Sequence, residues 1–179
     1  MAAEGVRVEG DWSRLVETIR NLNLSKSELR MLNAQIAQIV AEGSKERFET
    51  EKSPEGERWE PLSPATLEAR ARRRTRRKDG TSGYRTKRGK LSKRAERIIA
   101  SGRPLKDTGR LMRSIATKAT AEAAVIGTNL VQAAIQQLGG KAGRGKKVEI
   151  PARPYLGVSS SEEADIMELI NEFIRERIQ

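Results

Sequence analysis

The chain of 179 residues carries a net charge of +11 and contains no Cys and no His. Its length fits one domain, and the missing residue types exclude disulfides, thiolate nucleophiles, imidazole bases and zinc sites built on Cys or His. No apolar run approaches the roughly 18 residues that span a bilayer, and residues 1–6 lack a signal peptide's basic and apolar regions, so we expect a cytoplasmic product that avoids membranes.

Two helices are predicted in the N-terminal part of the chain. Asp11 can cap a short first helix, whose apolar residues recur every three or four positions. Ser25 and Glu28 have capping-box spacing, and the apolar period that follows predicts a long amphipathic helix over residues 25–50. Gly43 weakens the second half of that helix by about 1 kcal/mol relative to Ala, which makes it a candidate kink.

A proline-rich segment with one large aromatic residue follows the long helix. Residues 54–64 contain three prolines, so they predict turns rather than a helix. Trp59, together with Pro61 and Leu62, has two interpretations: the ring anchors a loop into the subunit's own core, or it packs against a neighbouring subunit. All three are therefore candidate interface residues.

Positive charge is concentrated in one block of the chain. Residues 70–94 hold thirteen Lys and Arg against one acidic residue, Asp79, while the rest of the chain sums to −1. We predict a helix over 64–78 capped by Ser63, a flexible excursion through the block, and a second helix near 91–99. The candidate polyanion or partner contacts are Arg72, Arg73, Arg74, Arg76, Arg77, Lys87 and Arg88.

The partner of this basic block is open between two classes. Such a density of cations binds polyanions in a salt-dependent way, which fits DNA. It also fits an acidic surface of a partner protein, and we favour protein narrowly. The block is best described as a basic insert, 70–94, within a single domain, 1–179.

The C-terminal half alternates short elements with turns. We predict a helical turn over 107–115, a hairpin of 114–120 with 122–128, a helical stripe over 130–138, a weak strand over 146–150 and an amphipathic helix over 161–178. Leu111 and Ile115 are expected to point inward. The fold class is α+β: a small central antiparallel sheet packed by the long N-terminal helix and the C-terminal helix, with the basic insert. The apolar core is expected to be small relative to the surface of the subunit, and such chains often bury more surface by oligomerising, so we predict an oligomer.

Residues 151–157 form an extended segment that is fixed by prolines. It is either a simple edge segment, or Arg153 is a fixed fork that pairs with a carboxylate across a subunit boundary. Arg153 and Pro154 are thus further candidate interface residues. On the second interpretation, replacing Arg153 by Ala would weaken assembly more than folding.

Catalytic and metal-binding patterns do not emerge from the remaining polar residues. The segment 139–147 is rich in Gly and Lys but lacks the order of a phosphate-binding loop. Glu162, Glu163 and Asp165 open a helix, where the helix dipole is a sufficient reason for acids. We predict a protein without enzymatic activity, cofactor or metal.

An ordered set of short motifs carries a family resemblance. The pieces are Phe48, Pro54-x-Gly56, Trp59-x-Pro61-Leu62-Ser63-Pro64, Thr108-Gly109-x-Leu111, Gly127-Thr128, Ala133-x-Ile135, Gly139-Gly140 and Ile150-Pro151-Ala152-Arg153-Pro154. Their order and spacing resemble the phage virion morphogenesis family, the tail-completion proteins of Mu-like and related tailed phages. Where that family tends to have Tyr and His, this chain has Gln132 and Gln136.

The resemblance implies a structural subunit of the virion. By analogy it forms a ring, a hexamer, at the tail end or head–tail junction, assembles in the host cytoplasm and contacts tail tube and head-connector proteins. The competing hypothesis is a basic nucleic-acid-binding protein that acts through residues 70–94. Binding that falls steeply with salt in a monomeric species would favour it.

Overall fold

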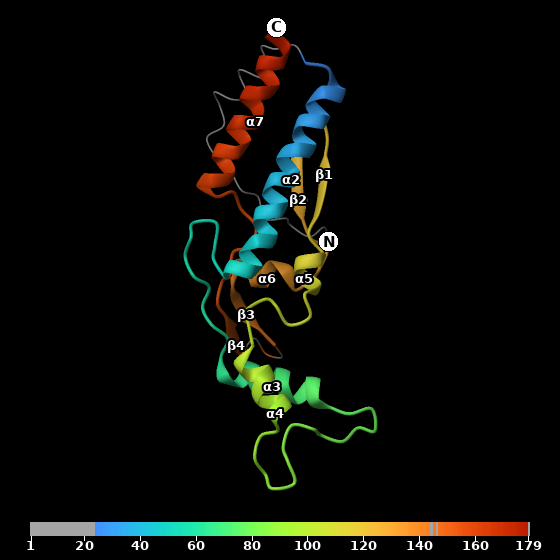
Figure 1. The fold of residues 1–179 in the computed structure, drawn as a ribbon, viewed down its shortest axis with the longest axis vertical. Helices are drawn as coiled ribbons and strands as arrows, with labels where there is room; N and C mark the ends of the chain where they lie inside the picture. Colours follow the sequence, from blue (N-terminus) through green and yellow to red (C-terminus); the bar gives the residue numbers. More distant parts are fainter. Residues whose placement is uncertain (1–23, 144, 146, 179) are drawn as a thin grey trace.

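The computed structural model describes residues 24–143, 145 and 147–178. The short helix expected after Asp11 lies outside these residues. The described part is elongated, with two long helices side by side at one end and a helical arm with two protruding loops at the other (Figure 1). None of the helices in this part has the length and apolarity required to cross a membrane.

The fold combines helices with two short antiparallel hairpins. The helices are α2 (Lys26–Thr50), α3 (Pro64–Thr75), α4 (Lys93–Ala100), α5 (Arg110–Arg113), α6 (Ala133–Leu138) and α7 (Ser160–Ile178). Strand β1 (Ala116–Ala119) pairs with β2 (Ala124–Gly127), and β3 (Gly140–Ala142) pairs with β4 (Val148–Ile150). This confirms the α+β class.

The strands form two separate ribbons, although one small sheet was expected. Within the described residues, each ribbon consists of two paired strands, in the order β1-β2 and β3-β4, and α6 separates the two in the chain. The first ribbon lies along α2. Strand β3 was not predicted, because its sequence, Gly140 to Ala142, has no alternation of apolar residues.

The capping box at the start of α2 is formed as expected. The Ser25 hydroxyl accepts a hydrogen bond from the Glu28 backbone N–H at 3.3 Å, and the Ser25 N–H donates to Glu28 Oε2 at 2.7 Å. These two bonds satisfy amide groups that a helix start leaves without partners. The helix continues through Gly43 to Thr50 as one element.

Two apolar clusters hold the body together. Between α2 and α7, Leu32 and Val40 pack against Ile166 and Ile170. The second cluster joins α2 to the loops and to α5, and its buried members are Ala41, Phe48, Trp59, Leu111, Ile115, Ala133 and Tyr155. The inward positions predicted for Leu111 and Ile115 are confirmed.

Three aromatic rings form the centre of the second cluster. The Phe48 ring lies 5.8 Å from that of Trp59, edge to face, and 5.3 Å from that of Tyr155. Such arrangements add about 0.5–1.5 kcal/mol per pair beyond the burial of their area. Burial also raises the pKa of Tyr155 to about 12, so its phenol stays neutral over the physiological range.

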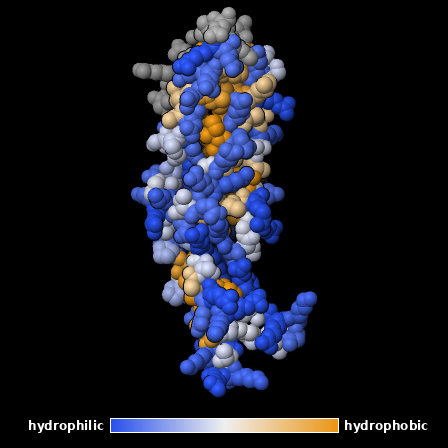
Figure 2. All heavy atoms as spheres, viewed as in Figure 1, coloured by the Kyte–Doolittle hydropathy of each residue, from blue (hydrophilic) through white to orange (hydrophobic). Residues whose placement is uncertain are grey.

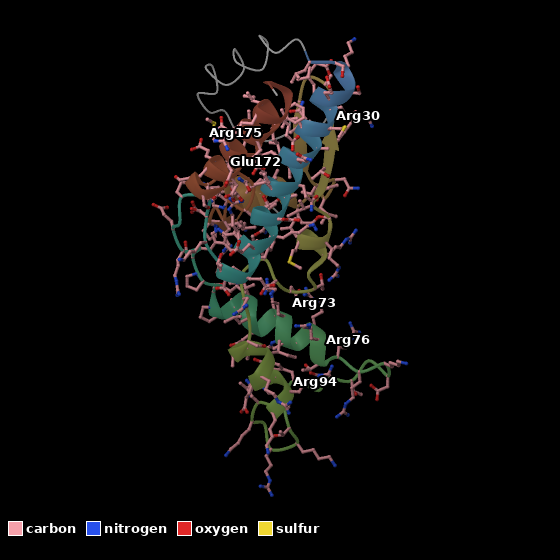
Figure 3. The ribbon with its side chains drawn as sticks, turned by 45° about the horizontal axis from the view of Figure 1, so that its top comes forward. Arg30, Arg73, Arg76, Arg94, Glu172 and Arg175 are labelled. Atoms are coloured by element: carbon pink, nitrogen blue, oxygen red, sulfur yellow. The ribbon has the colours of Figure 1, made fainter. Side chains whose placement is uncertain are left out.

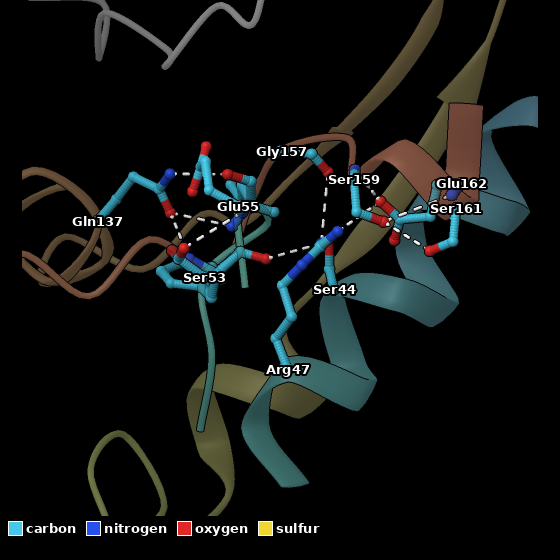
Figure 4. A network of polar contacts seen from close by, with 11 residues as sticks. Ser44, Arg47, Ser53, Glu55, Gln137, Gly157, Ser159, Ser161 and Glu162 are labelled. Carbon is cyan, nitrogen blue, oxygen red and sulfur yellow. Dashed lines mark hydrogen bonds and ion pairs between the residues drawn. The ribbon is translucent and has the colours of Figure 1, made fainter. Parts of the chain in front are cut away.

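A buried ion pair joins the second half of α2 to the first turn of α7. The Arg47 guanidinium pairs with the Glu162 carboxylate, and both side chains are 7% exposed. Arg47 Nη1 also donates to the backbone carbonyls of Tyr155 and Gly157, at 3.3 Å each (Figure 4). Glu162 is therefore more than an acid that suits a helix dipole, because it also fixes α7 to α2.

Gly43 is the residue that makes room for this pair. A Cβ atom at Gly43 would lie 1.4 Å from Glu162 Oε1, which is an impossible contact. A larger residue at this position would require the Glu162 side chain to move away, so Gly43 permits the close approach of α2 and α7 at which the ion pair forms.

The predicted stripe over 130–138 differs in the structure. Helix α6 begins only at Ala133, and the side chains of Val131 and Leu138 are 97% and 65% exposed. Gln137 is buried instead, because its Oε1 accepts from the N–H groups of Tyr155 and Leu156 at 3.0 Å each, and its Nε2 donates to the Leu156 carbonyl. Hydrogen bonding to the extended segment selects the buried face of α6.

Residues 64–103, which we call the basic arm, have a small core of their own. Helices α3 and α4 pack together, and Ala71, Tyr84 and Ala95 are buried between them. Helix α3 ends at Thr75, three residues earlier than expected, and α4 covers most of the predicted second helix.

The two loops of the arm are structured, although we expected a flexible excursion. We call residues 76–82 the first prong and residues 85–91 the second prong. Each is closed by a bridge between its ends, Arg76 with Ser82 and Arg85 with Leu91. The turn inside each prong ends at a glycine, Gly80 or Gly89, whose φ of 82° or 79° other residues resist.

Candidate interaction surfaces

The proline-rich loop is attached to the extended segment near the C-terminal helix. Trp59 is 6% exposed, and its indole Nε1–H donates to the Pro154 carbonyl at 2.9 Å. This agrees with the first of the two interpretations, in which the ring anchors its loop to the core of its own subunit. Of the candidate interface residues, Pro61 is exposed, and Leu62 and Pro154 are half-buried.

Arg153, in the extended segment, also bonds to the proline-rich loop. Its Nε donates to the Glu60 carbonyl at 2.9 Å and its Nη2 to the Pro61 carbonyl at 3.3 Å. The side chain is buried, and that burial lowers the pKa of its guanidinium from the ordinary value, with Glu60 acting in the opposite direction. The fork predicted at Arg153 is therefore bonded within its own chain, to carbonyl groups.

These contacts revise the expected effect of removing Arg153. We expect Arg153→Ala to lower the free energy of unfolding by about 2 kcal/mol, because two carbonyls lose a charged donor. Chemical denaturation of the purified protein measures this, with exposed Arg30→Ala as the control. A normal unfolding midpoint combined with defective assembly would restore the original expectation that Arg153 acts across a subunit boundary.

A cleft of about 600 Å³ lies beside this attachment, between the loop, α3, α6 and β4. Its lining includes Pro61 and Leu62 from the loop, and Val148 from β4. Gln132 and Gln136 also line it, so the two places where the family tends to have aromatic rings face the same cleft. A second, shallower hollow continues past Leu138 and shares the Glu149–Pro151 segment with the first.

Exposed apolar side chains border these hollows. Val148, on β4, lines the first hollow and is 58% exposed, and Leu138, the last residue of α6, lines the second. Val131, two residues before α6, is exposed as well. Apolar groups exposed beside a cleft are candidates for contact with another protein, because contiguous apolar surface is typical of interaction sites. This region is therefore a candidate subunit interface, and it contains Pro61 and Leu62 from the predicted set.

Arginines of α3 join the base of the arm to Asp107 of the body and bond to other residues of the arm. Arg73 pairs with Asp107, and Arg74 lies 3.9 Å from the other oxygen of the same carboxylate. Arg70 is half-buried and donates to the Arg103 carbonyl at 2.8 Å, and burial lowers its pKa from the ordinary value. Arg72 pairs with Glu68 one turn earlier on the helix.

The cations further along the arm are not held in ion pairs within the described residues. Within the described residues, no ion pair is formed by Arg76, Arg77, Lys78, Arg85, Lys87, Arg88, Lys90, Lys93 or Arg94, and all nine are exposed. Figure 3 shows Arg76 and Arg94 on the arm, far from Arg30 at the opposite end of the molecule. The predicted contact residues thus divide into a structural set on α3 (Arg72, Arg73, Arg74) and a free set on the prongs (Arg76, Arg77, Lys87, Arg88).

Asp79, the one acid of the block, serves its own loop. Its carboxylate accepts from the Thr81 N–H at 2.9 Å and from the Thr81 hydroxyl at 2.6 Å. The hydrogen bond from the Thr81 side chain, helped by the backbone bond, holds the pKa of Asp79 below its ordinary value. Asp79 therefore shapes the first prong.

Among the described residues, no group of three or more Asp or Glu side chains is placed to hold a metal ion. The features that stand out are two surfaces of opposite character, an apolar-edged cleft on the body and a cationic arm, on a small α+β protein.

Comparison with known proteins gives the family. The chain belongs to the phage virion morphogenesis family, whose model matches residues 10–81 and 77–175. A relative is the Mu-like prophage FluMu G protein 2 of Haemophilus influenzae, 51% identical over 77 residues. That match spans 43% of this chain and 56% of the relative's length. No solved structure matches.

Proposed function

We propose that this protein is a non-enzymatic subunit that completes the phage tail for joining to the head. In this role copies of the chain form a ring, a hexamer by analogy, at the tail end or head–tail junction. Its partners are itself, the tail tube protein and the head-connector protein. The mechanism is burial of complementary surfaces, without turnover, and the protein ends in the virion.

The observation that carries this proposal is membership of the phage virion morphogenesis family over most of the chain. The exposed apolar side chains beside the cleft supply a physical reason for oligomerisation. Burying apolar surface contributes about 25 cal/mol per Å², and Val131, Leu138 and Val148 stay in water until another molecule covers them. We assign the subunit interface of the ring to this region.

Complementation of a phage that lacks the gene tests the proposal. Lysates without the protein are expected to contain heads and tails that accumulate unjoined under the electron microscope, and the wild-type gene restores joined particles. Leu138→Glu with Val148→Glu should fail to restore them, because two carboxylates would be buried in the interface.

The matched control is Met31→Glu with Met167→Glu, which charges two exposed apolar residues on α2 and α7. It is expected to restore joining. Fully joined, infectious particles in the absence of the protein would contradict the function. Restoration by the Leu138 and Val148 variant would leave the function in place and contradict the assigned interface.

A further inference from the structure

We propose that the basic arm binds the backbone of double-stranded nucleic acid through its two prongs. This inference goes beyond tail completion, because it concerns a ligand of the arm and holds for the free subunit as well as for a ring. It also reverses the narrow preference for a protein partner that the sequence suggested.

The charge of the prongs selects a polyanion as the ligand. Nine exposed cations of residues 76–94 have no ion pair within the described chain, and Asp79 is occupied by Thr81. Duplex DNA carries about one negative charge per 1.7 Å of its axis, and each neutralised phosphate releases a condensed counterion. A ligand of this charge density matches a surface on which nine cations face one acid, Asp79.

The arm lacks the apolar centre that a protein interface requires. No large apolar side chain of residues 64–103 is exposed, whereas six are exposed on the described body. In Figure 2 the projecting lower end is mainly hydrophilic, and apolar groups are visible higher on the molecule, including between the blue groups at the level of the arm helices. Protein interfaces concentrate aromatic and apolar residues at their core and are depleted in Lys, so this surface fits a phosphate backbone better than a protein.

The aromatic residues of the arm indicate which form of nucleic acid, duplex or single strand, is the better ligand. Single-stranded nucleic acid is bound by bases that stack on exposed aromatic rings. Tyr84 is the one aromatic residue within residues 64–103, and it is 4% exposed. Its ring packs in the arm core, with the Arg72 guanidinium 4.6 Å from its centroid. The arm thus offers charge without a stacking surface, which suits a paired duplex.

The prongs hold their cations on a defined backbone. In the first, Arg77 N–H donates to the Thr81 carbonyl and Gly80 N–H to the Arg77 carbonyl, at 2.9 and 3.1 Å. The second repeats this pattern with Thr86 and Gly89. Two copies of one turn, with Arg77 and Lys78 on the first and Lys87 and Arg88 on the second, therefore present cations on two projecting tips (Figure 1).

Salt-dependent binding of a labelled 30-base-pair duplex by the full chain tests the proposal. The variant Arg77→Gln, Lys78→Gln, Lys87→Gln, Arg88→Gln removes four cations from the two tips. We expect it to bind about 100-fold or more weakly at 0.1 M salt, with the slope of log K against log salt reduced by about 3–4. Two duplexes of unrelated sequence are expected to bind equally, because backbone contacts carry no sequence information.

The control variant removes the same charge elsewhere: Lys26→Gln, Arg30→Gln, Lys45→Gln, Lys118→Gln, all at exposed positions outside the arm. Its salt slope should change by less than about 1. Equal losses for the two variants, with unchanged thermal unfolding, would overturn the proposal, as would wild-type binding that is tighter for polyglutamate or for a single strand than for the duplex. None of these outcomes bears on whether heads and tails join.

Discussion

Replacing Arg47 by Met is expected to lower the free energy of unfolding by about 3–5 kcal/mol. Met keeps most of the length of the side chain but removes its charge. The Glu162 carboxylate would then remain buried without its cation, and the carbonyls of Tyr155 and Gly157 would lose a donor. Domains of this size are stable by only about 5–15 kcal/mol, so this loss is a large part of the total.

Urea denaturation with a double-mutant cycle measures the effect. The double variant Arg47→Met, Glu162→Gln should be destabilised by less than the sum of the two single variants, because it removes the uncompensated charge. Arg30→Met is the matched control, since Arg30 lies exposed on the same helix, and it should change stability by less than about 0.5 kcal/mol. A loss below about 1 kcal/mol for Arg47→Met would show that the pair is unimportant for stability.

Gln137→Leu is expected to lower the free energy of unfolding by about 3 kcal/mol. Leu has nearly the same size, but the N–H groups of Tyr155 and Leu156 would lose their acceptor and the Leu156 carbonyl its donor. Each buried backbone group without a partner costs about 1–3 kcal/mol, and the greater apolarity of Leu offsets part of this.

The neighbouring residue provides the control for this prediction. Gln136→Leu changes the same residue type on the same short helix, at a half-buried position on the cleft. Thermal unfolding should show little change for Gln136→Leu and a clear decrease for Gln137→Leu. Equal unfolding temperatures for the two variants would contradict the role assigned to Gln137.

Elements specified by local sequence were predictable. The Ser25 and Glu28 pair marks the start of α2 to the residue, because capping is decided within four positions of the chain. Ser63 caps α3 in the same way, through the N–H of Thr66 at 3.3 Å. The β1-β2 hairpin was found from two short runs of β-branched residues, and its register pairs Ala116 with Gly127.

Features that depend on distant residues were not predictable. The partner of Glu162 lies 115 positions away, and no local pattern connects it to Arg47. The apolar stripe expected over 130–138 includes Leu138, which is exposed, whereas the hydrogen bonds to residues 155–156 bury Gln137. The close approach of Gly43 to Glu162 is likewise a contact between distant parts of the sequence, so no local pattern indicates it.

The spacing of glycines in the prongs indicates tight turns, although the composition of the segment favours flexibility. A glycine ends each turn at the fourth position, as in Arg77-Lys-Asp-Gly80 and Thr86-Lys-Arg-Gly89, and the body loop Ser53-Pro-Glu-Gly56 has the same spacing and hydrogen bonds. High charge and glycine content favoured a flexible segment, yet the spacing of these glycines favours a tight turn. The candidate contact residues were identified, but their division into structural and free sets required the structure.

The two ends of the basic arm lie close together, which makes the arm easy to replace in evolution. Arg70 of α3 bonds to the carbonyl of Arg103, and a methyl of Leu67 would contact a Cβ placed on Gly102, so the chain leaves and re-enters the body at one point. An insertion whose ends meet can be shortened, lengthened or exchanged by recombination with little disturbance of its host. Residues 64–103 are in this sense a cassette, and a laboratory chimera could carry a different cassette on the same body.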